Sequence, residues 1–299
     1  MAQTELVQAQ PITLPERAST SPGRKALRRF RRHRLAMLGV VIIVILVVAA
    51  LVGNEPAALM PNLKLTNKPP SLEHPFGTDR TGRDVLARTL VGGRVSLSVG
   101  LVAVLFSTAI GTLLGVLAGF YRGLVDQIIM RIVDMVMSFP VIVLLLTVVA
   151  IVGPGIFKIM VMIGLLTWTT PCRIIRAQFL SLREKEYVEA ARCLGMNDFD
   201  IAIKHILPNA IGPLLVYASF GVATAVLLEA GLSYLGLGVQ PPTPSWGNML
   251  NTARSLSTME RTAWQWIPPA ITTVLFVLAV NFVGDGIRDA VDPRTLFEK

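Results

Sequence analysis

The feature that most constrains this chain is a series of long apolar runs without a charged side chain. Residues 35–53 and residues 95–120 each lack Asp, Glu, Lys and Arg throughout. A helix that crosses the hydrocarbon core of a bilayer needs about 20 mostly apolar residues, so both runs predict membrane-spanning helices. Only 16% of the 299 residues are charged, against about a quarter in an ordinary soluble domain. The sequence therefore excludes a soluble globular enzyme and a disordered protein.

Four further runs predict spans at residues 135–157, 159–172, 210–236 and 264–284. The run 159–172 is weak, because 14 helical residues extend only about 21 Å. It can cross the bilayer if Lys158 and Arg173 extend their charged ends outward. The first run, 35–53, is longer than the apolar part of a cleavable signal peptide and follows 34 residues. We therefore predict an all-α membrane protein with six transmembrane helices.

The distribution of Lys and Arg predicts how these helices are oriented. Six spans place both termini on one side, and the flanking segments on that side hold 19 of the 28 Lys and Arg. The opposite loops, 54–94, 153–158 and 237–263, hold the other 9. Because cytoplasmic loops are enriched in Lys and Arg, we expect both termini to be cytoplasmic. This topology explains the arginine cluster at 28–34 better than nucleic-acid binding does.

The chain divides into a tail and one membrane domain. We expect residues 1–34 to form a cytoplasmic N-terminal tail and residues 35–299 to form the transmembrane domain. Its extracytoplasmic loop 54–94 begins Pro-rich and becomes helical near residue 82, and a second extracytoplasmic loop covers 237–263. Within the second span, Gly111, Gly115, Gly119 and Gly123 recur every four residues. That spacing places them on one helix face, where another helix of the bundle can approach closely.

The sequence contains no convincing catalytic or metal-binding pattern. His33, His74 and His205 fall in separate loops on both sides of the predicted membrane, which disfavours a shared metal site. The two cysteines, Cys172 and Cys193, form no CxxC pair and suggest neither a zinc site nor a disulfide framework. We assign no catalytic residue and no bound metal or cofactor to this chain.

Segment 77–84 nearly copies a phosphate-binding loop, with Gly77 and Gly82 at the right spacing. That motif continues with Lys and then Ser or Thr, but Arg83 and Asp84 stand there, and a carboxylate cannot replace the magnesium-binding hydroxyl. The predicted topology also places the segment outside the cell, away from ATP. We therefore expect a structural turn in which Asp79, Arg83 and Asp84 satisfy backbone groups and pair with one another.

Glu229 is the only acidic residue well inside a predicted span. An ionisable side chain in a membrane is costly and is a functional candidate by default. A structural role and a place along a transport pathway are equally good interpretations of it. A proton relay is less favoured, because a relay usually needs several such groups and no other span provides one.

The segment 173–208 is the most informative part of the chain. Good helix formers occupy 182–194, and Gly195 is a natural helix stop. Asn197 or Asp198 can cap a second short helix, which Pro208 is expected to break just before the fifth span. A simple connector does not need about 30 structured residues. The pattern therefore favours a docking surface for a cytoplasmic partner.

Within this segment, Glu189-Ala190-Ala191, Gly195 and Leu207-Pro208 match the EAA signature of ABC-importer permeases in their spacing. His205 stands where that signature has Ile, which is the one departure. Residues 75–98, 240–250 and 284–293 resemble the second permease subunit of dipeptide and oligopeptide importers. The resemblance covers residues 25–295. It is specific for the permease class and weak for the solute, because nickel- and glutathione-type importers share this class.

The resemblance implies a fold, a function and a set of partners. The fold is that of a type I ABC-importer permease in a bacterial inner membrane. The partners are a homologous permease subunit, two cytoplasmic ATPase subunits that bind ATP and Mg²⁺, an extracytoplasmic solute-binding protein and the lipid bilayer. By the same resemblance, the helix 189–195 within the EAA loop (residues 176–208) docks on an ATPase subunit. The extracytoplasmic motif would shape the outer mouth; its residues are Gly77, Thr78, Asp79, Gly82, Arg83 and Asp84.

The chain would thus be a conformational device that is not itself a catalyst, forming a peptide path with its sister permease. Three other readings compete with this one. A proton- or ion-coupled carrier that works alone would need several intramembrane charges, but only Glu229 is present. A membrane-embedded enzyme would need a nucleophile and base or a metal constellation. A simple structural anchor would not explain the EAA loop.

Overall fold

The computed structural model describes residues 22–291, which form helices and connecting loops. The α-helices are α1 (Pro22–Arg32), α2 (Arg34–Val52), α3 (Glu55–Leu59), α4 (Val85–Tyr121), α5 (Gly123–Met137), α6 (Val141–Val152), α7 (Ile156–Thr167), α8 (Thr169–Leu182), α9 (Glu186–Cys193), α10 (Asp198–Asp200), α11 (Leu207–Tyr234), α12 (Trp246–Leu250), α13 (Leu256–Arg261) and α14 (Ile267–Val291). Short 3₁₀ turns, η1 (Leu63–Leu65), η3 (Asn251–Arg254) and η4 (Ala263–Gln265), and a π-helical turn, η2 (Ile201–Ile206), complete them. The predicted all-α class is confirmed.

Five helical segments of the described chain are long and apolar enough to cross a membrane, and a bent pair provides up to a sixth. The five segments are Arg34–Val52, Val85–Tyr121, Ile156–Leu182, Asp198–Tyr234 and Ile267–Val291. The bent pair consists of α5 and α6, whose axes differ by 84°. The predicted single helix at 135–157 is therefore wrong. Pro140 explains the break, because proline lacks an amide hydrogen and disfavours helical geometry in the residue before it.

The fourth span is twice as long as predicted, since α7 and α8 together cover Ile156–Leu182. The prediction ended at Cys172 because Arg173 and Arg176 follow it. In the structure both guanidinium groups pair with carboxylates of α5. Arg173 lies 2.5 Å from Asp134, and Arg176 lies 2.7 Å from Asp126. Pairing lowers the cost of placing these charges beside an apolar helix, so the helix continues past them.

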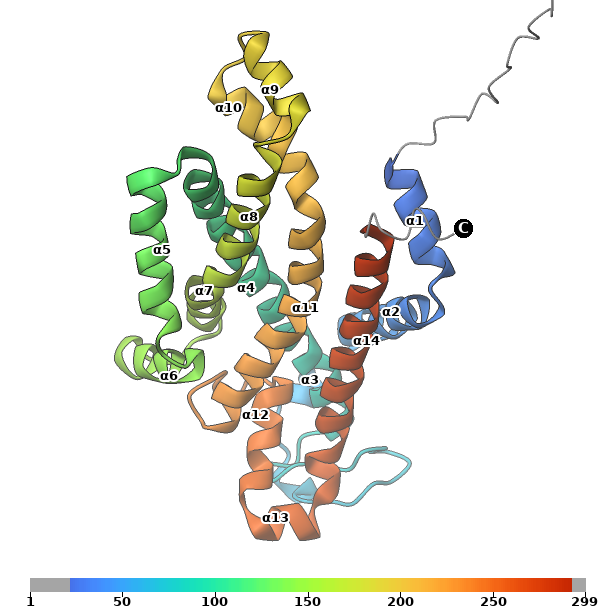
Figure 1. The fold of residues 1–299 in the computed structure, drawn as a ribbon. Helices are drawn as coiled ribbons and strands as arrows, with labels where there is room; N and C mark the ends of the chain where they lie inside the picture. The colour runs from blue at the N-terminus through green and yellow to red at the C-terminus, as the bar shows by residue number, and fades with distance from the viewer. Residues whose placement is uncertain (1–21, 292–299) are drawn as a thin grey trace, which may run out of the picture.

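Helix α4 is the centre of the bundle and contacts α2, α5, α7, α8 and α11 (Figure 1). Its glycine face packs against α8, as expected for three of the four positions. A Cβ atom added at Gly111, Gly115 or Gly119 would approach atoms of α8 to within 2.6–2.7 Å. Gly123 departs from the prediction. It begins α5 with a φ of +58°, and no atom lies within 4 Å of the position its Cβ would occupy.

The connecting segments gather at two opposite ends of the molecule (Figure 1). One end, the α9 end, carries α1, α9, α10 and the C-terminal turn of α14. The other, the α13 end, carries α3, α12, α13 and the 61–84 segment. The segments predicted to share a side of the membrane therefore do lie together.

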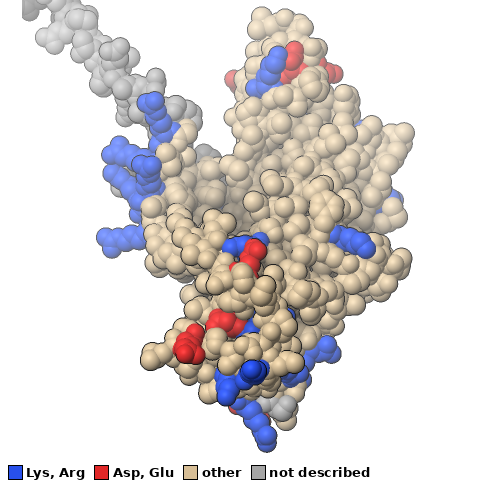
Figure 2. Space-filling view, turned by 180° about the vertical axis from the view of Figure 1, so that it is seen from behind, with Lys and Arg blue, Asp and Glu red and all other residues tan. Residues whose placement is uncertain are grey.

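Part of the predicted tail is helical. Residues 1–21 of the tail, and residues 292–293 of the C-terminal motif, lie outside the described residues. Residues 22–32 form α1, a helix that was not predicted from the sequence. The Arg side chains of α1 make a dense positive patch (Figure 2), and Phe30 on its other side packs near Gly286 of α14. His33 follows α1, and its Nδ1 accepts a hydrogen bond of 3.0 Å from the Ala36 amide to cap α2.

Candidate functional site

The EAA loop projects from the α9 end as a helical hairpin between α8 and α11 (Figure 1). The helix expected at 182–194 is shorter than predicted, because a turn separates it from the preceding helix. Helix α8 ends at Leu182, and α9 begins at Glu186. Arg183 lies in the intervening turn and donates a 2.7 Å hydrogen bond to the Phe120 carbonyl at the end of α4. This bond fixes the base of the loop to the centre of the bundle.

Helix α9 has one buried face and one exposed face. Val188 and Ala191 are buried in an apolar cluster that includes Ile201 and Ile206 of η2. Glu189 and Ala190 are exposed on the other side. The two alanines of the motif therefore have different tasks. Ala191 allows α9 to sit close to η2, whereas Ala190 presents a small side chain to the surroundings.

Gly195 ends α9 in a left-handed turn with a φ of +79°. Its amide donates to the Arg192 carbonyl at 2.9 Å, and the Met196 amide donates to the Ala191 carbonyl at 3.2 Å. This pair of bonds is the Schellman arrangement, which needs a residue that tolerates positive φ. The interval between Ala191 and Gly195 is thus set by helix-ending geometry.

The second half of the loop departs from the prediction. Asn197 caps α10 through a 2.7 Å bond from the Asp200 amide, but Pro208 does not break the following helix. The chain continues through η2 into α11. Leu207 donates its amide to the Ala202 carbonyl, five residues earlier. This wider turn accommodates the missing amide hydrogen of Pro208, and the Asn209 side chain donates to the His205 carbonyl at 2.8 Å.

The remaining residues of the EAA signature also differ in how exposed they are to the surroundings. Pro208 is exposed, whereas His205 and Leu207 are partly buried. Leu194 is 83% exposed and Phe199 is 70% exposed, so two large apolar side chains stand at the tip of the hairpin. Exposed apolar groups beside charged residues are typical of a protein-docking surface.

The 77–84 segment is a tightly hydrogen-bonded turn at the α13 end. Gly77 and Gly82 have φ values of +66° and +76°. The Thr78 hydroxyl accepts the Lys68 amide at 2.8 Å and also bonds to the Leu65 carbonyl. Asp84 caps α4 by accepting the Ala87 amide at 2.7 Å. These contacts fasten the 61–84 segment to the start of the central helix.

Asp79 is the hub of that turn. It accepts hydrogen bonds from the amides of Thr81 and Arg83 at 2.8 and 3.0 Å and pairs with the Arg83 guanidinium at 2.8 Å. Burial opposes its ionisation, but these bonds and the charges of Arg83 and Arg88 hold the pKa of Asp79 below its usual range. The expected partner for Asp84 was incorrect, because Asp84 pairs with His74 at 2.7 Å.

Glu229 is fully buried and accepts a hydrogen bond from each of three serines. The Ser233, Ser245 and Ser96 hydroxyls lie 2.6, 2.8 and 3.3 Å from its carboxylate. Each hydroxyl has one proton to donate, and each also accepts a backbone amide, from Val239, Asn248 and Trp246 respectively. The carboxylate is therefore the common acceptor that joins α4, α11 and the 239–248 segment.

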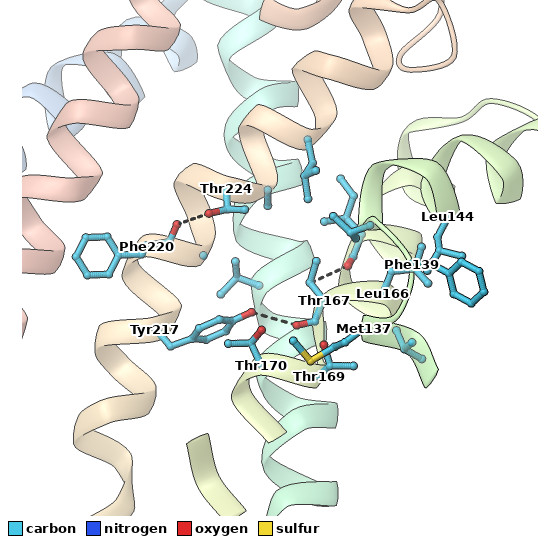
Figure 3. A pocket seen from close by; sticks show the side chains of 17 residues that line it. Met137, Phe139, Leu144, Leu166, Thr167, Thr169, Thr170, Tyr217, Phe220 and Thr224 are labelled. Atoms are coloured by element: carbon cyan, nitrogen blue, oxygen red, sulfur yellow. Dashed lines mark hydrogen bonds between the residues drawn. The ribbon is translucent and has the colours of Figure 1, made fainter. Parts of the chain in front are cut away.

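A cavity of about 410 Å³ lies between α4, the α5–α6 bend, α7–α8 and α11 (Figure 3). Its lining contains no Asp, Glu, Lys, Arg or His. Hydroxyl groups and aromatic rings provide its polar and apolar character. The labelled side chains in Figure 3 include Thr167, Thr169, Thr170, Tyr217, Thr224, Phe139 and Phe220. Glu229 is not among the lining residues.

This cavity could not be predicted from the sequence, because its residues come from six helices and none is charged. A partial signal was present in the chain. Pro140 and Pro171 each interrupt an apolar run, and Val136 and Thr167, four residues before them, line the cavity. The structure therefore separates three features: the EAA loop at one end, the 77–84 turn at the other, and the neutral cavity between them.

Comparison with known proteins identifies a family whose members resemble this chain. Residues 111–297 match the model of the binding-protein-dependent transport system inner membrane component, and residues 21–70 match the N-terminal transmembrane domain of oligopeptide transport permease C. A Brucella suis protein that carries the name peptide permease is 48% identical over 93% of both chains. The glutathione transport system permease protein of Escherichia coli O157:H7 is 39% identical over 97% of this chain and 96% of its own.

A solved structure matches the fold as well. It is an inward-facing form of the MetNI methionine ABC transporter, with a TM-score of 0.56. The match covers 69% of this chain and 96% of the other, at 23% identity.

Proposed function

Because this chain belongs to the family of binding-protein-dependent transport system inner membrane components, we propose that it is the permease subunit of an ABC importer for peptides. The 48% identity to a protein named as a peptide permease, over nearly the whole chain, carries the proposal. The neutral cavity supports it. A lining without charges would tolerate peptides whose side chains differ in charge, whereas its hydroxyl groups can bond to the main chain that all peptides share.

The proposed assembly contains a homologous permease, two ATPase subunits and a solute-binding protein. We place the α9 end in the cytoplasm, because the predicted segments of that end carry most of the Lys and Arg. The exposed side of α9, with Glu189, Ala190 and Leu194, would contact an ATPase subunit. The 77–84 turn and the 237–263 segment would then face the solute-binding protein. ATP chemistry would belong entirely to the partner subunits.

One exposed substitution on each end tests this arrangement. Ala190→Arg enlarges the exposed face of α9 without disturbing Ala191, and Leu72→Arg alters a fully exposed residue at the opposite end. We expect the tagged Ala190→Arg chain to co-purify with its sister permease but to lose the ATPase subunits. The Leu72→Arg chain should retain both. Equal retention of the ATPase subunits by both variants would refute the docking surface.

The solute class needs a separate measurement. ATP hydrolysis by the purified complex would be followed with its binding protein and either a set of short peptides or glutathione. Stimulation by several peptides of different charge is the expected result. The 39% identity to a glutathione permease favours glutathione, itself a tripeptide, as the second candidate. Stimulation by glutathione alone would select that alternative, and stimulation by neither would refute a peptide importer.

A further inference from the structure

Helix α8 leaves one carbonyl of the fourth span without its normal helical partner. Pro171 is the third residue of α8 and has no amide hydrogen. In a regular helix its amide would donate to the carbonyl four residues earlier, which belongs to Thr167. Thr167 is the last residue of α7 and lines the cavity. The break between α7 and α8 therefore presents a hydrogen-bond acceptor at the cavity wall.

Tyr217 of α11 supplies the missing donor. Its hydroxyl lies 3.1 Å from the Thr167 carbonyl oxygen (Figure 3). It also lies 3.3 Å from the Ser107 hydroxyl of α4. A phenol has one proton, and it can only be donated to Thr167, because a carbonyl only accepts. Ser107 must then donate its own proton to Tyr217. The resulting chain of bonds runs from α4 through α11 to the end of α7.

The contacts that α8 makes with α4 and with α11 differ in kind. At Gly111, α4 lies so close to α8 that an added Cβ would be 2.6 Å from Pro171 and 2.7 Å from the Trp168 carbonyl. Backbone packing therefore holds α8 to α4. Near the cavity, by contrast, α11 reaches the α7–α8 break through the Tyr217 side chain. Pro213 lies one turn before Tyr217 and removes a helical bond from α11.

Both helices lead to the EAA loop. Helix α8 enters the hairpin and α11 leaves it, so any displacement of the hairpin must be accommodated by one or both helices. Helix α11 is also held to α4 near Glu229, where a Cβ atom added at Gly100 would lie 2.8 Å from Val226. The movement that this packing leaves is a tilt of the 207–217 half of α11 relative to the α4–α8 pair. The bond between Tyr217 and Thr167 fastens that half of α11 to the α7–α8 break at the cavity.

We propose that Tyr217 is the gating residue of the peptide path, and that its bond to the Thr167 carbonyl is the contact exchanged when a peptide enters. This inference rests on the proposed function. A peptide main chain carries N–H donors that can bind the same carbonyl, and carbonyl acceptors for the Tyr217 hydroxyl. The Thr169 and Thr170 side chains line the same wall and provide further hydroxyl groups. Peptide binding would thus release the 207–217 half of α11 from the α7–α8 break and prepare the hairpin to move.

A double-mutant cycle tests the gate. Tyr217→Phe removes the donor and preserves the ring. Pro171→Ala restores a main-chain donor to the Thr167 carbonyl, so the hydroxyl becomes less important in that background. We expect Tyr217→Phe to raise peptide-independent ATP hydrolysis by the complete complex several-fold. The same change should have less than half that effect, on a logarithmic scale, when Pro171→Ala is present.

A distance measurement gives a second readout in the same complex. Spin labels would be placed at exposed positions of α8 and α11, by Ala177→Cys and Leu215→Cys, with the exposed Cys193 changed to Ser. Peptide should shift the distance distribution of the parent complex. The Tyr217→Phe complex should show the shifted distribution before peptide is added. A distribution and a basal hydrolysis rate equal to those of the parent would refute the gate, as would an equal effect of Tyr217→Phe in both backgrounds.

Failure of the proposed function has a different signature. A parent complex that peptide does not stimulate would refute peptide import. The purified full chain still allows the cycle to be measured as shifts in unfolding temperature. Coupling between Tyr217 and Pro171 in that assay would show the predicted bond. Coupling together with an unchanged hydrolysis rate and unchanged distances would mean that the bond is structural, and this result would overturn the gating role.

Discussion

Gly115 provides a sharp test of how closely α4 and α8 must pack. A Cβ atom at this position would lie 2.7 Å from the Cys172 carbonyl oxygen and 2.9 Å from the Cβ atom of Ile175. Neither contacting atom is the end of a flexible side chain, so neither can move without moving α8. Overpacking of this kind usually costs about 1–3 kcal/mol, and here we expect the upper half of that range.

Helix propensity acts in the opposite direction. Replacing a glycine inside a helix by alanine stabilises it by about 1 kcal/mol. We therefore expect Gly115→Ala to reduce the free energy of unfolding by a net ~1–2 kcal/mol. The matched control is Gly231→Ala in α11, because the nearest atom to its added Cβ, Ile142 Cδ1, is 4.0 Å away. That substitution should leave stability unchanged or raise it by up to about 1 kcal/mol.

The assay is unfolding of the purified chain in detergent, followed by tryptophan fluorescence for the parent and both variants under identical conditions. Gly115→Ala should unfold at a lower temperature than the parent, and Gly231→Ala at the same or a higher temperature. If Gly115→Ala were as stable as the parent, α8 could move away from α4 at little cost. Backbone packing would then not be what holds α8 to α4.

Three further predictions concern polar contacts. Glu229→Ala should destabilise the chain by about 2–3 kcal/mol, because three buried hydroxyls lose their acceptor, and a loss below 1 kcal/mol in the unfolding assay would contradict this. Because the pKa of Asp79 is lowered in the folded protein, its contribution to stability is complete above the usual carboxyl pKa of about 4 and is lost as pH falls through the lower folded-state pKa. Limited proteolysis of the 61–84 segment should therefore increase only in strong acid. An increase between pH 7 and 5 would contradict this prediction. Arg94→Lys should weaken the attachment of α2 to α4 by about 1–2 kcal/mol, because the Arg94 guanidinium donates to the carbonyls of Ala50, Leu51 and Gly53. Limited proteolysis just after α2 should become faster, and an unchanged cleavage rate would rule this out.

The sequence predicted the helical class because charge-free runs in a membrane protein have few alternatives to helices. It failed where spans are interrupted or extended by interactions between helices. Pro140 lies within an apolar run that hydropathy alone treats as continuous, yet it allows an 84° bend. Arg173 looked like the end of a span, and only its pairing with Asp134 shows why the helix continues.

Where prediction of the functional residues failed, it failed for the same reason, namely contacts between residues that are remote in the sequence. The EAA loop could be found because its residues are close in the chain and its spacing follows from local helix endings. The role of Glu229 depends on Ser96 and Ser245, which are remote in sequence, so its chemistry alone left two interpretations open. The cavity was out of reach for a similar reason. Tyr217 and Thr167 are 50 positions apart, and neither residue type is unusual in a membrane helix.

The Schellman turn after α9 has a consequence for the length of the loop. One residue inserted between Ala191 and Gly195 would rotate everything before or after it by about 100° around the helix axis. Either Ala191 would leave the apolar cluster or Gly195 would lose the position that requires positive φ. Substitutions on the exposed face of α9 do not change the spacing between Ala191 and Gly195. The hairpin can thus vary in its side chains, and so in its choice of partner, while insertions and deletions within α9 would destroy it.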